Sequence, residues 1–206
     1  GTVCAYPKHT PVPFVEDELW NGYPEETNAP YGIAKKTLMR LLQAYGEQYG
    51  MRGANLIPVN MYGPHDHFNL TSSHVIPALI LKFYNAMKNG DEVELWGTGS
   101  ASREFLYAPD CVKAIARAIE TNVSLEPINI GTGKEITIKD LATEIAEQMG
   151  YEGQIKWQSD KPDGQPRRCL DTSKAKNLLD FEAETDLQTG LKQTIEWFLN
   201  DKNWEI

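Results

Sequence analysis

The stretch Asn28-Ala29-Pro30-Tyr31-Gly32-Ile33-Ala34-Lys35-Lys36 marks the start of a helix. Asparagine is a favourable N-cap residue, and proline is well tolerated in the first helical turn. Apolar or aromatic residues then recur close to the helical period, at Tyr31, Ala34, Leu38, Leu41, Leu42, Tyr45 and Tyr49. The pattern predicts a helix over 30–49.

Tyr31 and Lys35 are four residues apart, so their side chains emerge on one face of this helix. A phenol is a poor acid-base catalyst at neutral pH, but an ammonium group one turn away stabilises its deprotonated form. Tyr-x-x-x-Lys is also common by chance, and a core tyrosine beside a solvated lysine is the alternative interpretation. The spacing alone leaves both interpretations open.

The rest of the chain alternates between short apolar runs and amphipathic segments. The predicted strands are 54–59, 92–96, 103–107, 127–130 and 155–157. The predicted helices are 75–89, 109–120, 137–149, 172–179 and 187–200. Residues 1–8 are predicted to be a strand end that runs into a turn, 8–29 a surface loop over an active-site mouth, and 61–73 a polar loop. This alternation indicates an α/β protein with a mainly parallel sheet, followed by a smaller mixed domain.

Composition excludes several classes of function. The 206 residues are 41% hydrophobic and 24% charged, which is typical of a globular protein, and the net charge of −9 argues against a general nucleic-acid binder. No apolar run is long enough to span a bilayer.

Three widely spaced cysteines, Cys4, Cys111 and Cys169, fit a reducing cytoplasm better than a disulfide framework. His65, His67 and His74 lack the spacing of a metal site, so no metal is predicted.

A glycine-rich turn that could hold a dinucleotide pyrophosphate is not found ahead of Tyr31. Gly97-Thr98-Gly99 and Gly131-Thr132-Gly133 are isolated Gly-x-Gly turns, which are more typical of loops than of phosphate sites. We therefore expect this chain to be the C-terminal part of a longer protein, with most of a cofactor-binding half outside it.

Several motifs along the whole chain carry a family resemblance. Thr2 after a strand, Tyr31 and Lys35 resemble the hydride-transfer site of the extended short-chain dehydrogenase/reductases. The resemblance narrows to the GDP-L-fucose synthase family through Cys4 and three further stretches: Asn60-Met61-Tyr62-Gly63-Pro64-His65-Asp66, Ser73-His74-Val75-Ile76-Pro77-Ala78 and Lys161-Pro162-Asp163-Gly164. It implies the C-terminal part of a Rossmann-type doubly wound parallel sheet plus a smaller mixed α/β substrate-binding domain.

The resemblance also implies domain limits. Residues 1–69 would be the remainder of the NADP-binding Rossmann domain. Residues 70–206 would be mainly the substrate-binding domain, with about 104–131 returning to the Rossmann sheet. Two subunits of this family pair through helices that include the one with the tyrosine, so a homodimer is expected.

The implied activity is the NADPH-dependent conversion of GDP-4-keto-6-deoxy-D-mannose to GDP-L-fucose, by 3,5-epimerisation and then reduction of the 4-ketone. Cys4 and His74 would be the acid-base pair of the epimerisation. Tyr31 would protonate the C4 oxygen, Lys35 would hold the nicotinamide ribose, and Thr2 would hydrogen-bond the C4 oxygen. Threonine departs here from the family's commoner serine, which retains the hydroxyl but restricts its rotamers.

Further residues match the family's cofactor and substrate contacts. Cofactor NADP(H) would lie against Pro58, Val59, Asn60 and Met61 at a strand end, and against Tyr31, Lys35 and His74. Lys82, Trp96, Arg103 and Asp163 would bind the GDP-sugar, with lysine at position 82 where arginine is commoner. Arg167 and Arg168 add positive charge near Asp163. No nucleic-acid or membrane partner is expected.

Two alternatives remain open on the sequence. The first is another nucleotide-sugar enzyme of the same family, a 4,6-dehydratase or a 4-epimerase. A dehydratase would carry an acidic pair soon after the threonine, where this chain has Val3 and Cys4. The second is a catalytically incomplete fragment that binds a nucleotide sugar without turning it over.

Overall fold

The computed structural model describes residues 1–201 of the chain, which divide into two compact units. Unit 1 comprises Gly1–Met61, Glu104–Glu135 and Arg168–Glu184. Unit 2 comprises Tyr62–Arg103, Ile136–Arg167 and, among the described residues, 185–201. Each unit is built from segments that lie far apart in the sequence, and each is described by itself.

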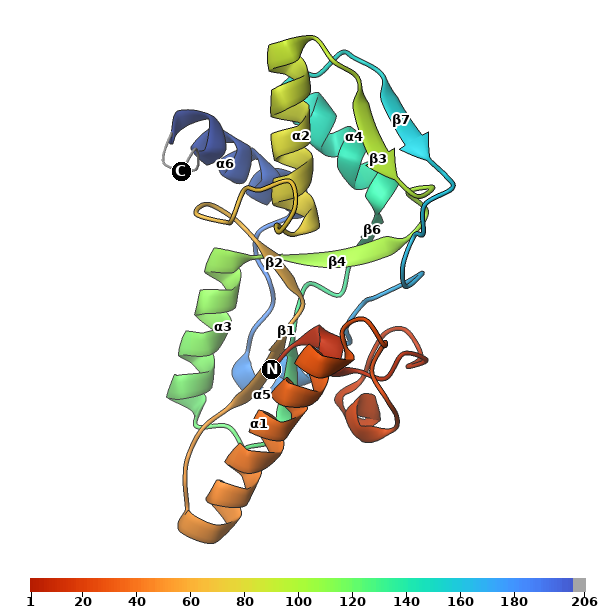
Figure 1. Cartoon of the computed structure of the whole chain (residues 1–206). Coiled ribbons are helices and arrows are strands. Elements are labelled where there is room, and N and C mark those ends of the chain that lie inside the picture. Colours follow the sequence, from red (N-terminus) through yellow and green to blue (C-terminus); the bar gives the residue numbers. More distant parts are fainter. Residues whose placement is uncertain (202–206) are drawn as a thin grey trace. The chain divides into compact units, whose positions relative to one another are not determined.

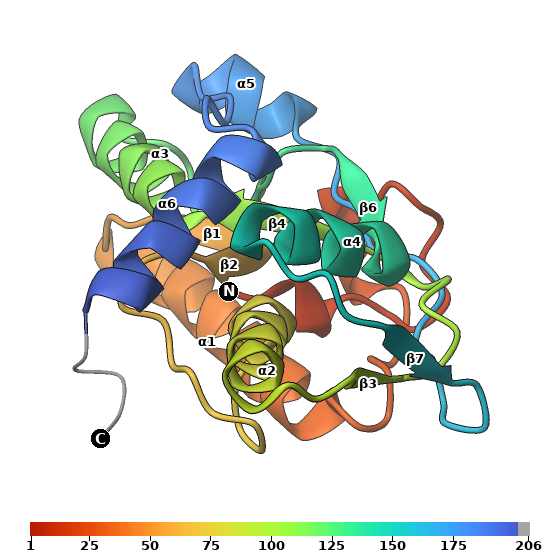
Figure 2. The same ribbon diagram turned by 90° about the horizontal axis from the view of Figure 1, so that it is seen from above.

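Unit 1 is built around a pair of parallel strands (Figure 1). Strand β1 (Asn55–Pro58) pairs with β5 (Pro127–Ile130), and Ile57 lies opposite Asn129. Helix α1 (Ala29–Tyr49) lies on one side of this pair, and helices α3 (Ala108–Thr121) and α5 (Ser173–Leu179) lie on the other (Figure 2). Two short 3₁₀ turns, η1 (Val3–Ala5) and η2 (Glu16–Trp20), precede α1. Parallel strands covered by helices on both faces confirm the predicted α/β class.

The core of unit 1 forms between the strands and these helices. All four residues of β5 are buried, as expected for a parallel strand covered on both faces, whereas β1 alternates between buried and half-buried residues. Helix α1 contributes Met39 to this core, whereas Leu38, Leu41 and Tyr45 on its apolar stripe are exposed. The periodicity therefore predicted the helix correctly, but most of its apolar stripe lies outside this core.

Unit 2 contains a pair of parallel strands and helices that pack on one another. Strand β3 (Val93–Trp96) pairs with β7 (Ile155–Gln158). Helix α4 (Ile138–Met149) packs between α2 (Val75–Asn89) and α6 (Leu187–Asn200). Aromatic rings join these helices to the preceding loop, because Phe68 and Tyr84 both pack on Phe198. A further sheet has the order β2 (Asn60–Tyr62), β4 (Ser102–Tyr107), β6 (Glu135–Thr137).

Apart from the strand end predicted near the start of the chain, all the predicted helices and strands are present, with ends that differ by at most one residue. Thr137 caps α4 as its spacing to Asp140 predicts, since its hydroxyl accepts from the Asp140 N–H at 3.0 Å. β2 and β6 were not predicted; both are three residues long, and β2 falls partly in the predicted polar loop 61–73. No helix among residues 1–201 is long and apolar enough to cross a membrane.

Two local predictions were wrong. Residues 3–5 form a 3₁₀ turn instead of a strand end, because the Thr2 side chain accepts from the Cys4 N–H and closes the chain on itself. The stretch 8–29 is not simply a surface loop, since Phe14 and Leu19 are fully buried. Phe14 also exchanges backbone hydrogen bonds with the segment 169–171, an anchor that no local pattern reveals.

Candidate functional site

The predicted site residues divide between the two units. Unit 1 holds Thr2, Cys4, Tyr31, Lys35 and the strand end 58–61, whereas unit 2 holds His74, Lys82, Trp96, Arg103 and Asp163. Within unit 1, the structure brings the hydroxyl, the thiol and the tyrosine-bearing helix together. The chemical roles of these residues stay predictions.

Helix α1 packs directly on the 3₁₀ turn that carries Cys4. A Cβ atom placed on Gly32 would overlap the carbonyl oxygen of Cys4, so only glycine allows the two backbones to come this close. Gly32 is the residue after Tyr31, and the Thr2 Oγ1 lies 3.3 Å from the Cys4 nitrogen on the same turn. The close approach therefore fixes the start of α1 against the hydroxyl-bearing and thiol-bearing residues.

Tyr31 and Lys35 lie on the same face of α1, as their spacing predicts. The Lys35 Nζ is 5.6 Å from the centroid of the Tyr31 ring, and Tyr31 is 51% exposed. The next residue, Lys36, points elsewhere: it is buried, donates to the Gly22 carbonyl at 3.4 Å and lies over the Trp20 ring. Burial lowers the pKa of Lys36. Only Lys35 of the two lysines is therefore placed to act on the phenol.

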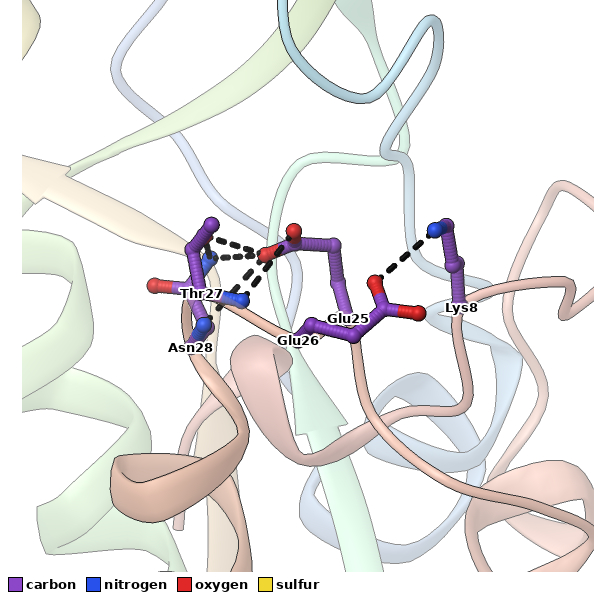
Figure 3. Close-up of polar contacts among 5 residues, drawn as sticks. All are labelled: Lys8, Glu25, Glu26, Thr27 and Asn28. Atoms are coloured by element: carbon purple, nitrogen blue, oxygen red, sulfur yellow. Dashed lines mark hydrogen bonds and ion pairs between the residues drawn. The ribbon is translucent and has the colours of Figure 1, made fainter.

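The chain entering α1 is held by a carboxylate and not by the predicted N-cap side chain. Asn28 stands at the N-cap position but makes no side-chain cap bond. Its amide donates to Glu25, which also accepts from the backbone and hydroxyl of Thr27 (Figure 3). These hydrogen bonds, with that of Thr27 the largest cause, lower the pKa of Glu25. The adjacent Glu26 pairs with Lys8 at 2.8 Å.

The strand end predicted to flank a nicotinamide is ordered by β5 and β4. The Val59 N–H donates to the Ile130 carbonyl at 3.0 Å, and the Asn60 amide donates to the Glu104 carbonyl at 2.9 Å. Pro58 is half-buried and Met61 is exposed. The segment thus follows the carboxyl end of a parallel strand, which is where open α/β sheets place their ligands.

Sequence reasoning named Arg168 only as added positive charge near Asp163, and it did not single out Glu104. The Arg168 guanidinium lies 3.6 Å from the Cys4 sulfur. Glu104 is fully buried and accepts from the backbone N–H groups of Thr132, Gly133 and Leu170. Burial raises the pKa of Glu104, although the three N–H donors oppose this effect. Both contacts join segments that are distant in sequence, so the only available signal was the Arg167-Arg168 pair itself.

In unit 2, His74 and Lys82 belong to α2. His74 is exposed at the N-cap position of the helix. The Lys82 ammonium donates to the Glu94 carbonyl at 2.8 Å, and burial lowers its pKa. Lys82 also lines a hollow of about 450 Å³ that includes three acidic residues, Asp91, Glu92 and Glu94. This surrounding charge would oppose a phosphate group in the hollow itself.

The other predicted substrate residues of unit 2 lie on β3, on β4 and in the loop 159–167. Trp96 is 70% exposed at the end of β3. Both oxygens of Asp163 bind Thr98, one through its N–H at 2.7 Å and one through its hydroxyl at 2.8 Å, and these bonds lower the pKa of Asp163. Arg103 donates to the Ser102 carbonyl. Asp163 therefore ties the loop 159–167 to the Gly97-Thr98-Gly99 turn beside Trp96.

Comparison with known proteins identifies relatives of the chain. Residues 1–131 match the NAD dependent epimerase/dehydratase family. The chain is 42% identical to GDP-L-fucose synthase 1 of Arabidopsis thaliana, over 98% of this chain and 62% of that protein. It is 40% identical to the GDP-L-fucose synthase of Escherichia coli K12, over 98% of this chain and 66% of that protein.

Solved structures give the same result. A GDP-L-fucose synthetase from Naegleria fowleri superimposes with a TM-score of 0.88 at 31% identity, covering 99% of this chain and 64% of that one. The chain thus spans a little under two thirds of the length of these relatives, and its Rossmann-type α/β fold is confirmed. By the match of 1–131 and by these relatives, the chain belongs to the NAD-dependent epimerase/dehydratase family.

Proposed function

We propose that the intact protein converts GDP-4-keto-6-deoxy-D-mannose to GDP-L-fucose with NADPH. The observation that carries the proposal is the contact of Gly32 with the Cys4 carbonyl, which seats the Tyr31 helix on the Thr2–Cys4 turn. A thiol, a hydroxyl, a phenol and an ammonium group are then supplied by two adjoining elements. Relatives named GDP-L-fucose synthase at about 40% identity support the choice of substrate.

The epimerisation follows from the acidity of the carbons beside the C4 ketone. A Cys4 thiolate takes the proton from C3 or C5, the electron pair of that C–H bond moves into an enolate on the C4 oxygen, and the sulfur becomes a thiol. His74, when protonated, returns a proton to the opposite face of the same carbon. Exchange of both acid-base partners with solvent then restores them.

The reduction requires a proton donor at the C4 oxygen. The Thr2 hydroxyl, which accepts from the Cys4 N–H, can donate a hydrogen bond to that oxygen. Tyr31 gives the final proton, and the Lys35 ammonium beside its ring stabilises the phenolate that remains.

The residues present fit the nicotinamide end of a dinucleotide. Tyr31 and Lys35 offer hydrogen-bonding groups on one helix face, and residues 58–61 follow a parallel strand end. When bound, NADPH would supply the hydride for C4. The Naegleria fowleri relative has also been solved with NADP, at a TM-score of 0.86.

Three further parts of the proposal concern substrate binding, assembly and location. Trp96 offers a flat apolar face to the nucleotide, while Arg103 and Lys82 supply positive charge and Asp163 accepts hydrogen bonds.

Exposed apolar residues along α1 support a homodimer through this helix. The three free cysteines suit a reducing compartment such as the cytoplasm.

A simple 4-epimerase is the second candidate function. A UDP-glucose 4-epimerase from Thermotoga maritima superimposes with a TM-score of 0.83 at 30% identity, so the fold alone supports both activities. Cys4 on the turn beside Tyr31 favours the first candidate, because a 4-epimerase has no proton to remove from C3 or C5.

The test incubates the intact protein with GDP-4-keto-6-deoxy-D-mannose and NADPH in deuterated water. Deuterium at C3 and C5 reports epimerisation, and NADPH absorbance reports reduction. We expect Tyr31→Phe to keep the exchange and lose NADPH oxidation, and Cys4→Ser to lose the exchange. A wild-type protein that neither exchanges protons nor oxidises NADPH would exclude this function and favour either the second candidate or a catalytically incomplete binding protein.

A further inference from the structure

Arg168 is a buried cation whose guanidinium meets the one half-exposed thiol of the chain. Its Nη1 lies 3.6 Å from the Cys4 sulfur, and the residue is only 9% exposed. The other two cysteines, Cys111 and Cys169, are buried in unit 1, and burial raises the pKa of Cys111. Cys4 therefore differs from both in having solvent access and a cationic neighbour at once.

The backbone that carries Arg168 is fixed from two sides. The Cys169 carbonyl accepts from the Phe14 N–H at 2.8 Å, and the Leu170 N–H donates to Glu104 at 2.7 Å. Phe14 and Glu104 are themselves fully buried. These two hydrogen bonds fix the backbone next to Arg168. The guanidinium is therefore held near the sulfur before any substrate binds, which makes the contact preorganised.

We propose that Arg168 is the positioning residue that donates to the Cys4 sulfur and stabilises the negative charge that this sulfur carries when it abstracts a proton beside the C4 ketone. This inference rests on the proposed function. An arginine keeps its charge at every physiological pH, so its N–H groups favour a negative sulfur over a neutral one. The guanidinium stays protonated throughout, and only the sulfur gains and loses the proton.

Alkylation of Cys4 tests the contact without any substrate. Iodoacetamide is uncharged, so its approach is not steered by the guanidinium, and peptide mass spectrometry reports modification at Cys4 itself. At fixed neutral pH, we expect Arg168→Gln to slow the alkylation about tenfold, because the negative sulfur that attacks iodoacetamide then loses its cationic neighbour. Arg168→Lys should restore most of the rate. If Arg168 merely covered the sulfur, Arg168→Gln would instead speed the reaction.

Arg117→Met is the matched control. Arg117 is another arginine of unit 1 that donates to a backbone carbonyl, that of Leu179, and it pairs with Asp180. Its loss removes one positive charge and a structural bond without touching Cys4, so the alkylation rate should not change. Should Arg168→Gln fail to fold, the wild-type rate is compared with that of the urea-unfolded chain. A slower folded-state rate would overturn the inference.

Deuterium exchange at C3 and C5 separates failure of the inference from failure of the proposed function. Exchange and alkylation should fall together in Arg168→Gln and recover together in Arg168→Lys. Exchange that falls while alkylation is unchanged would mean that Arg168 acts on the substrate, which overturns the inference and leaves the function intact. If Arg168→Gln slows the alkylation of Cys4 but the wild type shows no deuterium exchange, the result would support the contact between Arg168 and Cys4 and exclude the proposed function.

Discussion

Glu16 shows how a single buried carboxyl makes the stability of unit 1 depend on pH. Its side chain is buried, and one oxygen accepts from the Asn129 N–H at 2.8 Å. Burial raises the pKa of Glu16 above its ordinary value of about 4.3. Between the ordinary pKa of Glu16 in the unfolded chain and its higher pKa in the folded protein, the folded state holds more protons than the unfolded state. The free energy of unfolding therefore falls as pH rises through this range.

We therefore expect Glu16→Gln to become relatively more stable as pH rises. Glutamine keeps the oxygen that accepts from Asn129 but carries no charge to desolvate. The free energy of unfolding of the wild type minus that of Glu16→Gln should decrease from pH 4 to pH 8, measured by urea denaturation of the intact protein. The exposed Glu152→Gln controls for the loss of one negative charge. If the free energy of unfolding of the wild type minus that of Glu16→Gln instead grew with pH, the folded protein would favour the charged carboxylate of Glu16, and the prediction would be wrong.

A second prediction of stability concerns Glu104, whose carboxylate oxygens accept hydrogen bonds from backbone N–H groups. Both oxygens accept backbone N–H groups, and Glu104→Gln replaces one of these oxygens with an NH₂ group. At least one backbone N–H then loses its acceptor inside the core, which costs about 1–3 kcal/mol in the free energy of unfolding. Chemical denaturation should show this loss, while the exposed Glu126→Gln should change stability by much less. Equal effects in both variants would contradict the proposed anchoring role.

The sequence predicted the shared helix face of Tyr31 and Lys35, which lie close together in the chain, but not the contact between Arg168 and Cys4. Tyr31 and Lys35 share a helix face because four residues make about one turn, and the structure confirms this placement. Arg168 meets Cys4 across a separation of 164 residues. No periodicity encodes such a contact, since it depends on where Phe14 and Glu104 anchor the later segment.

At the level of elements, Gly32 decides how closely α1 approaches the Thr2–Cys4 turn. Gly32→Ala would ordinarily stabilise a helix by about 1 kcal/mol. Here the added Cβ overlaps the Cys4 carbonyl oxygen, so the two elements must separate at a cost of about 1–3 kcal/mol in the free energy of unfolding.

We expect Gly32→Ala to lower both stability and NADPH oxidation, because Tyr31 moves away from the Thr2 hydroxyl. Thermal denaturation and steady-state kinetics would measure the two effects. Gly46→Ala on the same helix is the control: its Cβ meets mainly the end of the flexible Leu125 side chain, which can shift. A stabilised and fully active Gly32→Ala protein would refute the close contact.

The elements also show why some boundaries were predictable. Helices such as 187–200 and strands such as 127–130 have a clear period or an apolar run, and their observed limits agree with those predicted. The stretch 8–29 has neither, yet Phe14 and Leu19 are buried by partners that come from elsewhere in the chain. Short strands β2 and β6 likewise depend on β4, which separates them in the sheet.

For the whole molecule, the unusual feature is the apolar surface of α1. Leu38, Leu41 and Tyr45 recur along one face of the helix and are each about half exposed. They form a stripe at helical spacing, which normally faces a packed partner. The buried face of α1 is narrow by comparison, with Gly32 and Met39 among its members. The same helix can therefore serve the proposed active site at its start and the proposed interface farther along.

If α1 mediates the proposed homodimer, Leu38→Glu will dissociate it. An unpaired carboxylate buried in an interface costs about 3 kcal/mol or more, which raises the dissociation constant by about two orders of magnitude. Sedimentation of the intact protein should show dimers for the wild type and monomers for Leu38→Glu at the same micromolar concentration. Met87→Glu, at an exposed apolar position on α2, controls for a new surface charge and should stay dimeric. A monomeric wild type, or a dimer unaffected by Leu38→Glu, would rule out this face as the interface.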